Sequence, residues 1–97
     1  MNQQPTKGGP MARQAAMLCR DPAFRLYLDR RRRYKWNMSE RDLPDGTHNE
    51  QDARDWLCKA CRIHSRAELD HHLEAERTFR KIRNRFNAWR AKQRGNA

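Results

Sequence analysis

The feature that most limits what this chain can fold into is its shortage of β-branched residues. The 97 residues include no Val, two Ile and three Thr, at positions 63 and 82 and at positions 6, 47 and 78. A sheet needs strands in which such residues alternate with polar ones. The sequence therefore predicts an all-α protein, a small bundle of four to five short helices.

Large apolar residues are also scarce, which limits the size of the core. Leu, Ile, Val and Phe together make up 12 of the 97 residues, below the roughly one-fifth at which disorder becomes common. A chain this short buries only about two thirds of its surface on folding. We expect a thin core that a partner helps to complete.

Local signals divide the chain into an arm, one helical domain and a tail. Residues 1–10 are rich in Gln, Gly and Pro and are expected to form a disordered arm. Residues 11–92 form the predicted domain, and residues 93–97 are expected to fray. A first helix is predicted to end near Arg20, and Asp21 is predicted to cap a second that runs from Pro22 to about Lys35.

The second half of the domain carries two apolar stripes. Asn49 is predicted to cap a third helix whose core-facing residues are Ala53, Trp56, Leu57, Ala60 and Cys61. Residues 65–68 have the capping-box pattern and start a short helix, with Asp70 available to cap another. The last helix is predicted from about residue 72 to 92, with the stripe Phe79, Ile82, Phe86 and Trp89.

The sequence does not indicate export or insertion into a membrane. No stretch approaches the roughly 18 consecutive apolar residues of a membrane span or the apolar region of a secretory signal. The three Cys residues are an odd number, which favours reduced thiols over a disulfide framework. We expect a cytoplasmic protein.

The charge balance points to an anionic partner. The formal net charge is +10, and 17 of the 22 basic residues are Arg. The planar guanidinium binds phosphates and carboxylates through paired hydrogen bonds. A nucleic acid or an acidic protein surface is therefore the expected partner.

Two basic segments are the candidate binding surfaces. The first consists of Arg30, Arg31, Arg32, Arg33, Lys35 and Trp36, where the indole could stack on a base. The second lies on the last helix and consists of Arg77, Arg80, Lys81, Arg83, Arg85 and Arg90. In the simpler interpretation, both are solvated helix surfaces, and the first complements the dipole of its helix.

A loop and a group of possible ligands are weaker candidates. Residues 37–48 are predicted to form a flexible surface loop, in which Leu43 and Pro44 could contact a partner such as a host prolyl isomerase. Cys58, Cys61, His64 and His71 include a CxxC pair that could bind zinc. They lack a second ligand pair, and Cys61 fits the core stripe, so no metal or other cofactor is expected.

The chain carries no motif of an enzyme. A glycine-rich phosphate loop, an HExxH sequence and a nucleophile elbow are all missing. His71 and His72 stand beside acids, but their place at a helix start explains them as surface charge. Catalysis is therefore not expected.

Three segments together resemble small accessory proteins from the recombination regions of lambdoid-type bacteriophages, among them the anti-RecBCD protein. These segments are ARQAAMLCRDPAFRLYL at 12–28, DGTHNEQDARDWLCKACRIHSRAELD at 45–70 and FRKIRNRFNAWR at 79–90. The resemblance implies a non-enzymatic protein that binds a host recombination helicase-nuclease in the bacterial cytoplasm and favours phage recombination. Direct binding of RNA or DNA, as by an antiterminator or a regulator, is the main alternative. A subunit that folds only within a larger assembly is the third.

Overall fold

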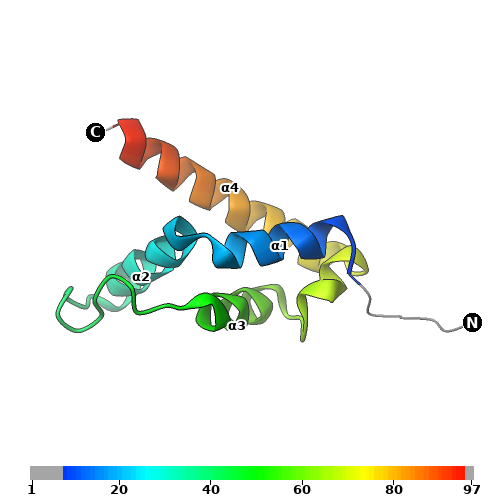
Figure 1. The fold of residues 1–97 in the computed structure, drawn as a ribbon, viewed down its shortest axis with the longest axis horizontal. Helices are drawn as coiled ribbons and strands as arrows, with labels where there is room; N and C mark the ends of the chain where they lie inside the picture. The colour runs from blue at the N-terminus through cyan, green and yellow to red at the C-terminus, as the bar shows by residue number, and fades with distance from the viewer. Residues whose placement is uncertain (1–7, 96–97) are drawn as a thin grey trace, which may run out of the picture.

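The computed structural model describes residues 8–95 and confirms the predicted all-α bundle. It contains the helices α1 (Pro10–Arg20), α2 (Pro22–Trp36), α3 (Glu50–Cys61) and α4 (Leu73–Gly95), with a 3-10 helix, η1 (Arg66–Asp70), before α4. No strand occurs within residues 8–95. In Figure 1, α1 and α3 lie across the middle of the molecule, while the C-terminal end of α4 extends beyond the other helices.

The three predicted helix starts are confirmed by their caps. The Asp21 carboxylate accepts a hydrogen bond from the Ala23 backbone N–H at 2.9 Å. Asn49 forms a reciprocal capping box with Asp52 at the start of α3. A second box starts η1, whose 3-10 geometry makes it a tighter element than the α-helix that such boxes usually begin.

The ends of the domain differ from the prediction. Residues 1–7 of the expected arm lie outside the described residues. Gly9, by contrast, has its N–H 2.6 Å from the Asp70 carboxylate, and Pro10 already belongs to α1. The last helix continues through Gly95, three residues beyond its predicted end at residue 92, and residues 96–97 of the predicted frayed tail at 93–97 lie outside the described part.

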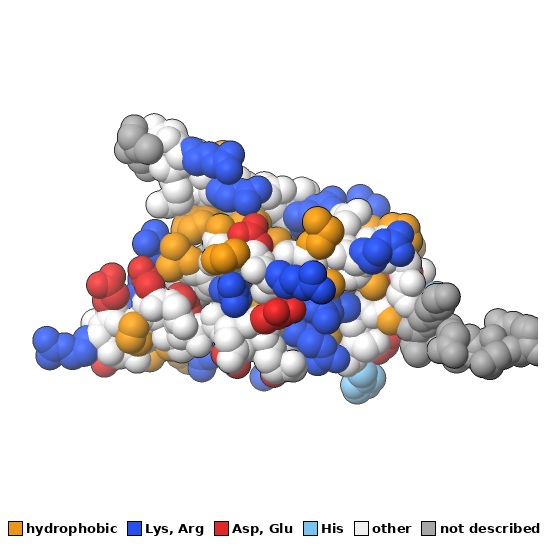
Figure 2. Space-filling view, in the orientation of Figure 1, with side chains coloured by type: hydrophobic (Ala, Val, Ile, Leu, Met, Phe, Trp, Pro, Cys, Tyr) orange, Lys and Arg blue, Asp and Glu red, His pale blue; other side chains and the backbone are white. Residues whose placement is uncertain are grey.

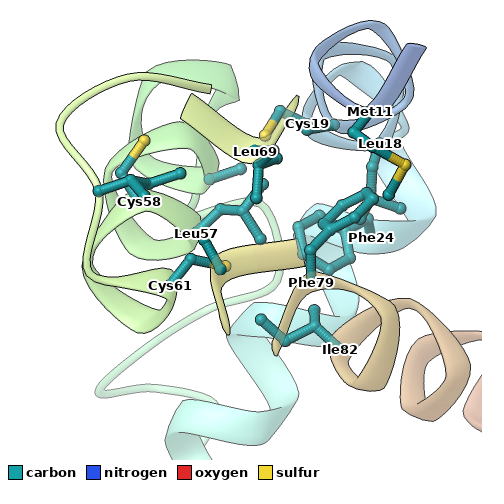
Figure 3. Packing of buried hydrophobic residues seen from close by; sticks show 14 of the residues in the cluster. Met11, Leu18, Cys19, Phe24, Leu57, Cys58, Cys61, Leu69, Phe79 and Ile82 are labelled. Atoms are coloured by element: carbon teal, nitrogen blue, oxygen red, sulfur yellow. The ribbon is translucent and has the colours of Figure 1, made fainter. Parts of the chain in front are cut away.

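Three phenylalanines form the centre of the core. Phe24, Phe79 and Phe86 are at most 1% exposed, and the rings of Phe24 and Phe86 meet edge to face with centroids 5.3 Å apart. Figure 3 shows Phe24 beside Phe79, with Leu57 and Leu69 packed toward them from α3 and η1. These long aromatic side chains join all the helices around a core with few aliphatic residues.

The stripe predicted for α3 is partly wrong. Ala53, Leu57 and Cys61 are buried, but Ala60 is exposed and Trp56 is only half-buried. Cys58 takes the place of Ala60 in the core, which rotates the buried face of the helix away from Trp56. The Trp56 side chain is consequently partly exposed at the surface.

Side chains on the outside are strongly basic. Figure 2 shows Lys and Arg side chains distributed over the face that α1 presents, with Asp and Glu side chains in smaller numbers among them. Within residues 8–95, no helix is both long and apolar enough to span a membrane.

Candidate functional site

A groove between α2 and α3 brings part of the first basic segment together with α3. Its volume is about 410 Å³. Buried Leu28 and nearly buried His48 form part of its lining. The polar and aromatic lining residues are Arg31, Arg32, Lys35, Trp36, Trp56 and Lys59.

Each tryptophan of the groove has a cation beside it. The Arg31 guanidinium carbon lies 5.3 Å from the centroid of the Trp56 ring, and Lys35 Nζ lies 5.6 Å from that of Trp36. Trp36 is 63% exposed. These contacts place positive charge next to two indole rings, of which Trp36 is exposed and Trp56 is partly exposed.

No carboxylate of residues 8–95 lines the groove. Within the described residues, Arg31, Arg32, Lys35 and Lys59 make no ion pair. An adjoining hollow, which shares Arg32 and Lys59, is lined by Asp52 and Asp55. The groove is thus a site of uncompensated positive charge with acidic residues beside only one part of it.

Two arginines of the same run have a structural role. Arg33 is only 13% exposed, donates to the Leu43 carbonyl at 2.7 Å and pairs with Asp45 at 2.8 Å. Arg30 lies 3.5 Å from the same carboxylate and 5.9 Å from the centroid of the Trp89 ring. Hydrogen bonding from Arg33 lowers the pKa of Asp45. Arg33, one of the predicted binding residues, is therefore engaged with the loop instead of being free for a partner.

The loop that these arginines hold is also better anchored than predicted. Leu43 is buried, so it is not available to a partner, whereas Pro44 is exposed. The buried Asp29 carboxylate accepts hydrogen bonds from the backbone N–H groups of Gly46 and His48 at 2.7 and 2.9 Å. Residues 43–48 are thereby fixed to α2, and the expectation of a flexible surface loop does not hold there.

On α4, most of the predicted binding cations already have partners. Arg77 and Arg80 pair with glutamates one turn earlier, at 3.5 and 2.7 Å. Arg90 pairs with Asp21 at 3.3 Å, and Arg83 donates to the side chain of Gln14. Only Lys81 and Arg85, among the six, are exposed and make neither an ion pair nor a side-chain hydrogen bond within the described region.

Two residues of the groove were not among the predicted binding residues. Trp56 was assigned to the core, and Lys59 stands alone in sequence as a single cation among apolar residues. Trp56 and Lys59 are three positions apart, so both lie on the same side of α3. This spacing is the signal from which the pair could have been found.

Cys58, Cys61, His64 and His71, the weak candidates for zinc ligands, are not gathered in the structure. Cys58 and Cys61 are buried free thiols, whereas His64 is exposed. Burial raises the pKa of Cys61 to about 11, with the neighbouring Cys58 adding to the shift. Among residues 8–95, no three Cys, His, Asp or Glu side chains are placed to hold a metal ion.

Comparison with models of protein families, with curated proteins and with solved structures finds no match to this chain.

Proposed function

We propose that this protein binds single-stranded nucleic acid in the groove between α2 and α3. The observation that carries the proposal is one groove that combines four cations with two exposed or partly exposed tryptophans. Among the described residues, these cations have no ion-pair partner and no carboxylate lines the groove. Proteins that bind single strands combine a basic track for the phosphates with aromatic faces on which bases stack. Trp36 and Trp56 are suited to stacking, while Arg32 and Lys59 are suited to phosphate contacts.

A single strand fits this groove better than a duplex does. In a duplex the bases are stacked on one another, so an indole reaches a base face only where the strand is unpaired. The tryptophans here flank the groove with cations beside their rings. The same arrangement accepts DNA or RNA, because every base has an aromatic face.

The test measures binding of a fluorescent 15-nucleotide single strand by anisotropy at several salt concentrations. The variant Arg32→Gln/Lys59→Gln removes two cations from the groove, and Lys81→Gln/Arg85→Gln removes two exposed, unpaired cations from α4 as a control of equal charge. We expect the groove variant to bind about tenfold or more weakly. Its slope of log affinity against log salt should fall by about 0.7 for each phosphate that the variant no longer neutralises.

Equal effects of the two variants would mean that the strand responds only to net charge, and the groove would be rejected as the site. Quenching of tryptophan fluorescence by the strand provides a second readout. We expect Trp56→Phe to reduce the quenching while the fold is kept. A duplex of the same sequence is expected to bind less tightly than the single strand.

The second candidate is the binding of a host recombination helicase-nuclease in the bacterial cytoplasm. The observation in its favour is Tyr34, which is 92% exposed on α2, two residues before the exposed Trp36. Exposed Tyr, Trp and Arg side chains dominate the binding energy of many protein interfaces. In this second candidate function, the chain binds the helicase-nuclease and catalyses no reaction itself.

This candidate is tested with a purified bacterial helicase-nuclease and a linear duplex, by following degradation of the DNA ends. Addition of the protein is expected to slow degradation, and Tyr34→Ala is expected to weaken the effect several-fold. An unchanged rate of degradation at micromolar protein would reject this function. The oligonucleotide measurements are unaffected by that result.

A further inference from the structure

A second basic hollow lies on the other flank of α3, among α1, α3 and η1. Its volume is about 350 Å³, and it is lined by Arg13 of α1, Arg54 of α3 and Arg66 of η1. The remaining lining residues are small, namely glycine, alanines and one serine. Trp56 and Lys59 line the α2–α3 groove instead, so the two basic sites are separate.

Among the described residues, the Arg66 guanidinium has no ion-pair partner. Its Nη1 atom is buried and has no hydrogen-bond partner. The guanidinium contacts the buried thiol of Cys19, whose pKa is raised by burial although the hydrogen bond from Arg66 acts to lower it. Buried donors without partners are uncommon, because nothing replaces the hydration that they give up. An anion in the hollow that Arg66 lines would place a negative charge beside this guanidinium.

The other two arginines also have little compensation. Arg13 is exposed and makes no ion pair within the described part of the chain. Arg54 lies 3.5 Å from the Asp55 carboxylate and 3.5 Å from the His64 carbonyl, both at the long end of such contacts. Glu50 lines a small adjacent hollow together with Arg54 and Arg66, and its carboxylate lies 3.5 Å from Arg20.

The geometry points to a binding site for a phosphate group in this hollow. Three guanidinium groups from three elements surround a space lined by small side chains, with no carboxylate in the lining. Arginine forks match the oxygens of a phosphate. Figure 2 shows Lys and Arg side chains gathered between α1 and α3 on this face. The phosphate is that of a small molecule or the terminal phosphate of a nucleic-acid strand.

The test titrates the ¹⁵N-labelled full-length protein with inorganic phosphate at constant ionic strength and follows backbone amide shifts. We expect saturable shifts at Ala12, Ser65 and Ala67, which line the hollow. Arg13→Gln/Arg54→Gln is expected to weaken the affinity at least tenfold. Arg94→Gln, at the exposed end of α4, serves as the control and should leave the affinity within twofold.

The Arg13 and Arg54 side chains are both at least partly solvent-exposed, so Arg13→Gln/Arg54→Gln is expected to fold. Unchanged amide shifts away from the hollow verify the fold of this variant. Arg66→Gln removes the unpartnered donor itself and should abolish the saturable shifts. Shifts that do not saturate, that fall only on the α2–α3 groove, or that persist in the variants would overturn the proposal. Weaker strand binding by the Arg32→Gln/Lys59→Gln variant has no bearing on these outcomes.

The source of the phosphate is identified with two oligonucleotides that differ only in a 5′-phosphate or a 5′-hydroxyl. If a strand end occupies the hollow, the 5′-phosphate increases affinity in the wild type and not in Arg13→Gln/Arg54→Gln. If the two strands bind equally while inorganic phosphate still saturates the hollow, the ligand is a small phosphate-bearing molecule.

Discussion

The carboxylate of Asp70 caps α1 at Gly9, although the two residues are 61 positions apart in sequence. Its Oδ2 accepts from the backbone N–H groups of Gly9 and Ala12 at 2.6 and 3.0 Å, and Oδ1 accepts from Met11 at 3.0 Å. The first turn of α1 contains no acid, and its own N-cap residue is a glycine. Asp70 therefore supplies both the acceptors and the negative charge that a helix start favours.

We predict that Asp70→Ala lowers the free energy of unfolding by about 2 kcal/mol, as expected for the removal of a charged cap with several donors. Urea unfolding followed by circular dichroism measures the change. Asp42→Ala is a suitable control, because Asp42 caps only a turn of the exposed loop through Ser39. Equal effects of the two substitutions would contradict a special role for Asp70.

The same carboxylate predicts a pH dependence of stability. Burial acts to raise the pKa of Asp70, but the three N–H donors outweigh it and hold the pKa below its ordinary value. A depressed pKa in the folded state stabilises the protein above the ordinary pKa near 4, and this contribution is lost as the pH falls through the folded value. The difference in stability between wild type and Asp70→Asn should be greatest near pH 7 and shrink toward pH 2.

Asp29 is expected to be the most sensitive polar position of the fold. It is fully buried, and besides the two loop N–H groups it lies 2.6 Å from His48 Nδ1. Asp29→Ala leaves the buried His48 groups without an acceptor and removes the acceptor of the part-buried Gly46 N–H. We predict a destabilisation of about 3 kcal/mol or more. Asp29→Asn keeps one acceptor oxygen and should cost less. Hydrogen exchange at Gly46 and His48 should accelerate in the alanine variant.

The core and the groove are distinguished by two aromatic substitutions. Phe24 is completely buried, and Phe24→Leu is expected to cost about 1 kcal/mol or more because a ring is replaced by a smaller side chain. Trp56 is half-buried, so Trp56→Phe should have a smaller effect on stability and a larger one on strand binding. If Trp56→Phe lowered the free energy of unfolding more than Phe24→Leu does, Trp56 would have to be regarded as a core residue.

Much of the fold could be predicted because its signals are local. Asp21 before Pro22, Asn49 before two acids, and the box at residues 65–68 each satisfy backbone groups within four residues, and each begins a helix in the structure. Asp70 was predicted to cap the following helix. Its actual partner, α1, is brought beside it only by the packing of η1, which no local pattern encodes.

The candidate site could be predicted only in part for the same reason. A run of four arginines indicates an anionic partner, but the neighbours of each guanidinium depend on which turn of α2 carries it. Arg33 faces the loop and Asp45, whereas Arg31 and Arg32 face α3. Lys59 has no neighbouring cation in sequence, so its contribution to the groove follows only from the position of α3 beside α2.

The three cysteines give a final prediction about chemical reactivity. Cys19, Cys58 and Cys61 are all buried, and burial raises the pKa of each thiol, that of Cys61 to about 11. Because the thiolate is the reactive form, the native protein at pH 8 should react with a disulfide reagent such as Ellman's reagent far more slowly than the urea-unfolded chain. Three thiols should titrate per molecule after unfolding. Fast reaction of one thiol in the native state would show that its helix opens locally, and cysteine-to-serine variants would identify which residue reacts.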